Sequence, residues 1–209
     1  MQPGETLALV GRTGAGKSSS LHLLGCLYTS WSGSVRIAGE DPSSLAEEDR
    51  RRLIGVAPQV VQLFSGTVFD NLILGDESVS REAVQRAATV AGVDSSIQNL
   101  PNGYDTMLGR GVDLSGGQRQ LLALAPALDW DPAVLLLDEA TAAIVSASEA
   151  AFRAALRASV SSQDRAVLTV AHRLSTAREA GQVLVMEEGR IVAEGTPEGL
   201  MRRQGRFAA

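Results

Sequence analysis

The sequence predicts an α/β domain with a mainly parallel sheet flanked by helices and an inserted helical subdomain. Short apolar runs alternate with helical patterns along most of the 209 residues, which is typical of a parallel sheet covered on both faces. From about residue 65 to residue 127 the strand pattern stops, and helical patterns interrupted by glycine and proline replace it. We therefore expect one domain over residues 1–209, with 65–127 as its approximate helical subdomain and the remainder as the core.

The first elements are expected around a glycine-rich turn. An apolar run at 6–10 leads into this turn, and an amphipathic segment at 18–27 follows it, so the order is strand, loop and helix. Further short strands are expected at 34–38 and at 54–57, where apolar residues end at turn-forming residues. After residue 57 the pattern gives way to the helical block.

Within and after that block, capping and apolar signals define the remaining elements. Ser80 is a good N-cap for a helix at 81–91. The continuous apolar run at 134–137 predicts a strand buried on both faces of a parallel sheet. A helix at 147–158 and a strand at 166–170 come next. The chain then closes with a hairpin of two strands, 182–186 and 190–193.

Charge and hydrophobicity exclude several kinds of protein. The formal net charge of −5 argues against a surface built to hold nucleic acid, so we expect no nucleic-acid partner. No apolar run approaches the roughly 18 residues that a membrane-spanning helix needs. The first residues lack the basic region and apolar core of a signal peptide. Any link to a membrane is therefore expected to come through a partner.

The glycine-rich turn has the complete pattern of a phosphate-binding loop. Its backbone N–H groups are expected to surround phosphates, Lys17 to reach the outer phosphates, and the Ser18 hydroxyl to bind Mg²⁺. Lys17 is also the single lysine among 19 basic residues, at a place where a planar guanidinium poorly mimics a compact ammonium. The residues expected to bind the nucleotide here are Gly11, Arg12, Thr13, Gly14, Ala15, Gly16, Lys17, Ser18 and Ser19.

Polar residues follow three of the expected strands, at the sheet edge where ligands gather. Asp138 is expected to hold Mg²⁺, and Glu139 to orient or deprotonate an attacking water. His172 follows another apolar strand and should project near the γ-phosphate, and the Gln59 amide could reach Mg²⁺ or water. His22, inside the helix after the phosphate loop, is expected to be a structural histidine.

A second anion site is expected where a serine caps a helix ahead of two glycines. The serine satisfies the first N–H groups of the helix, and backbone without side chains lets a phosphate approach closely. One chain with two such half-sites indicates that two copies close around shared nucleotide. The residues of this second half-site are Ser115, Gly116, Gly117 and Gln118.

Together these segments resemble the nucleotide-binding domain of ATP-binding cassette (ABC) transporters, over nearly the whole chain. Residues 11–18 resemble the Walker A motif, Gln59 the Q-loop, 114–118 the signature and 134–139 the Walker B strand with its glutamate, while His172 resembles the switch histidine. Residues 63–68, 138–141 and 172–176 resemble the exporter branch.

The resemblance implies a P-loop NTPase that uses ATP and Mg²⁺, with Glu139, His172, Gln59 and Lys17 as catalytic residues. Ser18, Gln59 and Asp138 would hold the metal. It further implies a head-to-tail dimer in which each ATP lies between Lys17 of one subunit and Ser115 of the other. Dimer closure would drive the transmembrane domain of an exporter, fused upstream or separate. The chain would then lie on the cytoplasmic face of the cell membrane through that partner, and would be soluble alone.

Several positions depart from the family pattern. Thr6 already belongs to the strand before the phosphate loop, so the family's preceding strands and the aromatic residue that stacks on adenine are absent. Met1 therefore looks like the start of a shortened chain or a misplaced start. Val145 stands where an aspartate is usual, and Pro126 where an arginine is usual. The segment 106–111 lacks the acidic residue often found before the signature.

These departures leave two alternatives to an ATP-hydrolysing exporter subunit. One is a nucleotide-responsive module that dimerises or docks with little hydrolysis. The other is a soluble ABC ATPase of DNA repair or translation, which the acidic charge and the lack of a long coiled-coil insertion between Gln59 and Ser115 disfavour.

Overall fold

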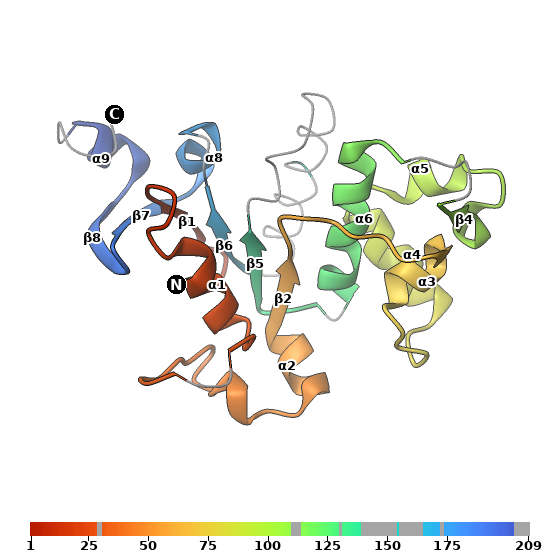
Figure 1. Ribbon diagram of the computed structural model, residues 1–209, viewed down its shortest axis with the longest axis horizontal. Coiled ribbons are helices and arrows are strands. Elements are labelled where there is room, and N and C mark those ends of the chain that lie inside the picture. The colour runs from red at the N-terminus through yellow and green to blue at the C-terminus, as the bar shows by residue number, and fades with distance from the viewer. Residues whose placement is uncertain are drawn as a thin grey trace.

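A mainly parallel sheet forms the centre of the computed structural model, which describes residues 1–28, 31–109, 114–129, 131–138, 154, 165–171 and 174–202 (Figure 1). Among these residues the sheet has the order β2-β5-β6-β1-β7-β8. Of the six described strands of this sheet, only β8 runs antiparallel to its neighbour, β7. Its strands are β1 (Thr6–Val10), β2 (Ile54–Ala57), β5 (Val134–Asp138), β6 (Ala166–Val170), β7 (Gln182–Glu187) and β8 (Arg190–Gly195).

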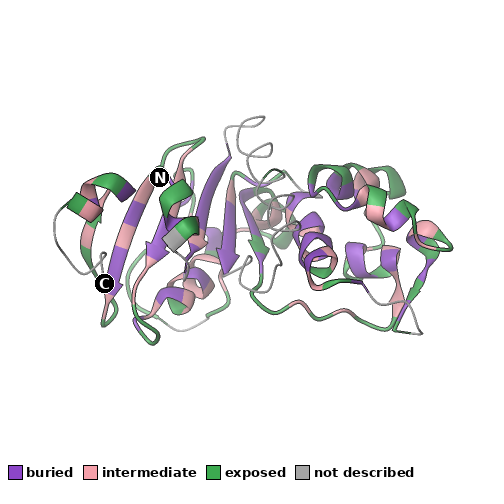
Figure 2. Ribbon diagram, turned by 90° about the horizontal axis from the view of Figure 1, so that it is seen from above, coloured by how far each residue is buried: buried purple, intermediate pink, exposed green. Residues whose placement is uncertain are grey.

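Helices cover the sheet and extend beyond β2 at one end (Figures 1 and 2). Near the strands lie α1 (Lys17–Leu24), α2 (Glu47–Leu53), α8 (Leu174–Glu179) and α9 (Pro197–Arg202). The group beyond β2 comprises α3 (Val68–Ile73), α4 (Arg81–Val90), α5 (Asp94–Gln98) and α6 (Gly116–Asp129). Two short 3₁₀ turns, Pro42–Ser44 and Gly103–Asp105, and a small antiparallel pair, β3 (Gly66–Thr67) with β4 (Met107–Leu108), complete the described elements.

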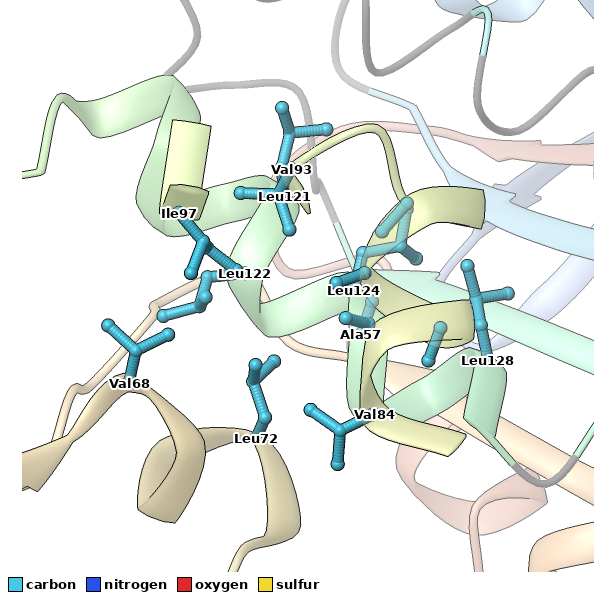
Figure 3. Close-up of a cluster of buried hydrophobic side chains, with 14 of the residues drawn as sticks. Ala57, Val68, Leu72, Val84, Val93, Ile97, Leu121, Leu122, Leu124 and Leu128 are labelled. Atoms are coloured by element: carbon cyan, nitrogen blue, oxygen red, sulfur yellow. The ribbon is translucent and has the colours of Figure 1, made fainter. Parts of the chain in front are cut away.

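One apolar cluster joins the helices beyond β2 to the sheet. Leu122 and Leu124 of α6 are almost completely buried, and they pack with Val68 of α3 and Ile97 of α5 (Figure 3). Ala57, at the end of β2, belongs to the same cluster. Because α6 packs on both β2 and α4, it connects the sheet to the other helices of this group.

Most of the expected elements are confirmed. The strands at 6–10, 54–57 and 166–170 have the expected bounds, and the terminal hairpin forms, with longer strands than expected. Ser80 caps α4, its hydroxyl accepting the N–H of Ala83. The helix after the phosphate loop ends at Leu24, before Gly25, rather than at residue 27. The helix expected at 147–158 lies outside the described residues, apart from the helical Ala154.

The strand expected at 34–38 is wrong. In the part of the chain that the structure describes, this segment makes only one isolated bridge, between Ile37 and Glu40. A strand is stable only when a neighbouring strand satisfies its backbone groups. The local apolar pattern cannot reveal whether such a neighbour exists.

Pro126 lies inside α6, which continues to Asp129. A proline in a helix interior has no N–H to donate and costs about 3 kcal/mol relative to alanine. We expect Pro126→Ala to raise the free energy of unfolding by about 1 to 3 kcal/mol, measured by urea denaturation followed by circular dichroism. The control is Pro197→Ala, because Pro197 opens α9, where no helical hydrogen bond is lost. A Pro126→Ala variant no more stable than the wild type would contradict this expectation.

Candidate functional site

The phosphate loop lies between β1 and α1, as the sequence predicts, and it packs against the end of β7. Gly11, Gly14 and Gly16 have φ angles of 154°, 84° and 99°. A Cβ atom on Gly11 would lie 2.2 Å from the carbonyl oxygen of Met186. The backbone N–H of Gly189 also donates to Ala15 O at 2.9 Å. The turn between β7 and β8 therefore supports the loop from behind, a contact that no local pattern in the sequence indicated.

Lys17 is held inside the loop. Its side chain is buried, with 4% of the residue exposed. The ammonium donates to Gly11 O at 2.8 Å and to Arg12 O at 3.1 Å. Buried charges of this kind need hydrogen-bond partners, and here the carbonyl groups of the loop provide them. Lys17 therefore holds a positive charge at the point where the loop would surround phosphates.

Ser18 and Asp138 meet across 120 residues of sequence. The Ser18 hydroxyl donates to Asp138 Oδ1 at 3.1 Å, and Asp138 is 7% exposed at the end of β5. A hydroxyl and a carboxylate beside a phosphate loop form an all-oxygen donor set that fits Mg²⁺, which usually takes one or two protein ligands together with substrate phosphates. Among the described residues there is no group of three or more His, Cys, Asp or Glu side chains that could hold a metal without such phosphates.

His22 also faces Asp138, although the sequence pattern indicated only a structural histidine. Its Nε2 lies 3.8 Å from Asp138 Oδ2. The ring of Tyr28 contacts the imidazole edge-on, with centroids 6.1 Å apart and an interplanar angle of 66°. His22 stands four residues after Ser18 on α1, and this spacing, which places both on one helix face, was the signal that could have found it.

Ser115 caps α6 in a reciprocal arrangement. Its hydroxyl accepts the N–H of Gln118 at 3.2 Å, and Gln118 Oε1 accepts the N–H of Ser115 at 2.8 Å. Ser115 is exposed. Strands β2, β5 and β6 lie between α6 and the β1–α1 loop (Figure 1). The structure therefore does not bring the two half-sites of one chain together.

Gln59 lies in the exposed segment just after β2. The neighbouring carbonyl of Pro58 accepts a hydrogen bond of 3.4 Å from the buried Gln120 of α6. This bond connects the Gln59 segment to the helix that Ser115 caps, and sequence reasoning missed it. Glu139, His172 and the departure at Val145 lie outside the described residues.

A groove with a volume of about 410 Å³ lies between β2, the segment after it, α3 and α6. Large apolar side chains on its lining face solvent, with Val60 68%, Phe64 62% and Leu74 59% exposed. Asn71 fixes the shape of one wall, because its Oδ1 accepts the N–H of Phe64 at 2.7 Å and its amide donates to Phe64 O at 3.0 Å. The groove is thus a formed apolar surface beside Gln59.

Arg51 of α2, which lines this groove, is paired with Asp76. Hydrogen bonds from Ser78, and then from Arg51, lower the pKa of the Asp76 carboxyl below its ordinary value. A carboxyl group whose pKa is lowered by folding stabilises the fold at pH values above its unfolded-state pKa, near 3.9. This stabilisation is lost as the pH falls through the folded-state pKa. Asp76 therefore contributes to stability at neutral pH.

We expect Asp76→Asn to be less stable than the wild type at pH 7, with the difference shrinking as the pH is lowered below about 4. Urea midpoints across this pH range measure it. Asp49→Asn, an exposed change of the same charge on α2, is the control. A difference between wild type and Asp76→Asn that stays constant with pH would count against this account.

The parallel sheet, the phosphate loop and the Ser18–Asp138 pair define a P-loop nucleoside triphosphatase fold. Residues 1–142 match the ABC transporter family. That match covers more than half of the chain, and the chain belongs to this family.

Similar proteins agree with this assignment. The chain is 44% identical over 209 residues to "ATP-binding cassette sub-family B member 6" of Homo sapiens, covering 100% of this chain and 25% of that protein. It is 42% identical over 207 residues to "Probable multidrug resistance ABC transporter ATP-binding/permease protein YheH" of Bacillus subtilis, covering 99% of this chain and 30% of that protein. The chain thus spans about a quarter to a third of these relatives.

A solved structure has the same fold. "Structure of a bacterial Atm1-family ABC exporter with ATP bound" aligns with a TM-score of 0.86 at 39% identity, covering 99% of this chain and 36% of that one. The P-loop NTPase class expected from the sequence is therefore confirmed. No helix in the described part of the chain has the length and apolar character needed to cross a membrane.

Proposed function

We propose that this chain is the ATP-binding and ATP-hydrolysing part of an ABC exporter, in which ATP-driven dimer closure is coupled to transport by a membrane domain. The observation that carries the proposal is the Ser18–Asp138 hydrogen bond of 3.1 Å beside the buried Lys17. This hydrogen bond brings Asp138 of β5 beside Ser18 of α1, so the proposed metal-binding groups lie next to the proposed phosphate-binding lysine. The similarity to exporters does not favour a docking module without hydrolysis or a DNA-repair or translation ATPase.

Each side chain of the core has a proposed role. Lys17 neutralises the outer phosphates, and Ser18 and Asp138 hold Mg²⁺, with Gln59 reaching the metal or its water from the segment after β2. Bound Mg²⁺ would neutralise charge that develops on the phosphates. Glu139, next to Asp138, orients or deprotonates the attacking water, and His172 lies near the γ-phosphate. The nucleotide-contacting set is the one expected from the sequence, residues 11–19 and 115–118.

The second half of the nucleotide site is proposed to come from another copy or a related domain. Ser115 is exposed, and its helix lies across the sheet from the phosphate loop of the same chain (Figure 1). An exposed helix N-terminus with a capping serine offers N–H groups to an anion. A head-to-tail dimer would place Ser115 of one chain opposite Lys17 of the other. Within this arrangement residues 1–209 act as one ABC-type ATPase domain, with about 65–127 as its helical subdomain.

The groove beside Gln59 is proposed to receive the membrane domain. Its exposed apolar residues Val60, Phe64 and Leu74 form a patch suited to an apolar partner surface. The Gln120–Pro58 bond links this surface to α6, so that movement at the groove would reach Ser115. The name of YheH describes ATP-binding and permease functions in one protein. The chain would then act at the cytoplasmic face of the membrane through this partner.

The test is Mg²⁺-dependent phosphate release from ATP by the chain. We expect activity that requires the metal and falls by roughly tenfold or more in Glu139→Gln, because the carboxylate that would activate water is lost. Glu179→Gln, the same change on α8, is the matched control and should leave the rate unchanged. Hydrolysis that continues undiminished in Glu139→Gln would overturn the assigned role. Nucleotide binding without any hydrolysis in the wild type would instead support the docking module.

A further inference from the structure

Two side chains of α1, one helical turn apart, approach Asp138 from the same side. The Ser18 hydroxyl donates to Oδ1 at 3.1 Å, and His22 Nε2 lies 3.8 Å from Oδ2. Because residues four apart share a helix face, this arrangement follows from the helix geometry once α1 packs beside β5. Each oxygen of the carboxylate thus faces a different polar group, Oδ1 a hydroxyl and Oδ2 an imidazole.

The imidazole is placed where it is both oriented and accessible. Tyr28 contacts its ring edge-on at 6.1 Å. The His22 side chain is 42% exposed, whereas Asp138 is only 10% exposed at its side chain. A ligand that reaches the carboxylate from solvent would therefore meet the imidazole on the same approach.

The His22 imidazole differs in its metal preference from the Ser18 hydroxyl and the Asp138 carboxylate. Mg²⁺ strongly prefers oxygen ligands, and Ser18 and Asp138 supply only oxygen. Imidazole nitrogen instead favours borderline metals such as Ni²⁺ and Zn²⁺, whose affinity for nitrogen ligands exceeds that of Mg²⁺. A nitrogen donor beside Asp138 should therefore change which cation the site prefers.

We propose that His22 is a specificity-determining ligand of the nucleotide-dependent metal site, and that its Nε2 shifts the preference of this site from Mg²⁺ toward divalent transition metals such as Ni²⁺ and Zn²⁺. The inference rests on the proposed function, because the cation is bound together with nucleotide. Ser18 and Asp138 hold either cation, and His22 adds a contact that only the transition metal uses well.

The experiment compares wild type with His22→Gln in the presence of Mn²⁺ and a non-hydrolysable ATP analogue. Glutamine keeps a polar side chain of similar reach but replaces the nitrogen ligand with an amide oxygen. Electron spin-echo spectroscopy of the bound Mn²⁺ should show ¹⁴N coupling in the wild type and lose it in His22→Gln. Tyr28→Phe, which retains the aromatic contact to the imidazole, is the control and should keep the coupling.

Metal affinities provide a second readout. We expect His22→Gln to weaken Ni²⁺ binding by about tenfold, the scale typical of altered metal-site partners, and Mg²⁺ binding by less than about twofold. A histidine that only packs against its neighbours, or only holds Asp138 in place, would change both affinities equally. The ratio of the two affinities therefore separates metal ligation from a structural role.

The spectra and the affinities together test whether His22 is a metal ligand. Loss of ¹⁴N coupling to the Mn²⁺ probe, together with a lower Ni²⁺/Mg²⁺ affinity ratio in His22→Gln, supports the proposal. Coupling that is missing in the wild type, or that persists in His22→Gln and so comes from a nitrogen other than that of His22, overturns it. An unchanged affinity ratio overturns it as well. These results leave the proposed function standing, whereas a failure to bind the ATP analogue with either metal would overturn both.

Discussion

Replacing Lys17 with methionine is expected to lower the affinity for ATP by about 100-fold, which corresponds to about 3 kcal/mol. Lys17 is 4% exposed and its ammonium donates to Gly11 O and Arg12 O, so the charge is already at the position where phosphates would bind. Methionine has a similar length but cannot neutralise phosphate charge. Titration with a fluorescent ATP analogue in the presence of Mg²⁺ measures the loss.

Two further variants show what Lys17 contributes. Lys17→Arg keeps the positive charge but replaces a compact ammonium by a planar guanidinium, and we expect it to bind ATP as poorly as Lys17→Met. Arg86→Met removes one positive charge from an exposed position on α4 and should leave the affinity unchanged. If Lys17→Arg binds ATP as tightly as the wild type, the affinity depends on the positive charge alone and not on the compact shape of the ammonium.

Gly55→Ala is expected to lower the free energy of unfolding by about 3 kcal/mol, the upper part of the range for overpacked sites. A Cβ atom on this residue of β2 would lie 2.3 Å from the carbonyl oxygen of Ala127 in α6 and 2.8 Å from Pro132 Cγ. Neither backbone oxygen nor a proline ring moves aside easily, so α6 would have to shift away from β2. Urea denaturation followed by circular dichroism measures the change.

Gly181→Ala is the matched control for Gly55→Ala. Its nearest neighbour would be Thr6 O at 3.5 Å, an ordinary contact, so a change within about 0.5 kcal/mol is expected. Because α6 begins beside Ser115, the shift in Gly55→Ala should also disturb the proposed dimer contact. Equal stability losses in the two variants would show that close packing of α6 on β2 is not the cause.

The phosphate loop shows how much of the site could be predicted locally. Its residues are consecutive in the chain, and one ligand, phosphate, requires their types. The strand before the loop and the helix after it therefore lie where the sequence indicates. The N-caps at Ser80 and Ser115 were predictable for the same reason, because a cap and the N–H it satisfies are three residues apart.

Contacts between distant segments were not predictable. The sequence placed Ser18 and Asp138 in one proposed metal site, but their hydrogen bond depends on α1 packing beside β5. The approach of His22 to Asp138 follows from the same packing, and it was missed. The strand expected at 34–38 did not form because an apolar run indicates a strand without supplying its partner.

Neighbouring residues were enough to predict the family, the order of strand and loop around Lys17, and the cap at Ser115. Hydrophobic periodicity, capping and phosphate binding are local properties of the sequence. Other features arise only when distant segments pack together. They are the sheet order, the groove beside Gln59, the close approach of Gly55 to α6 and the position of His22. Packing depends on the shapes of surfaces that no single stretch of sequence contains, and it is this packing that brings Ser18 and His22 to Asp138.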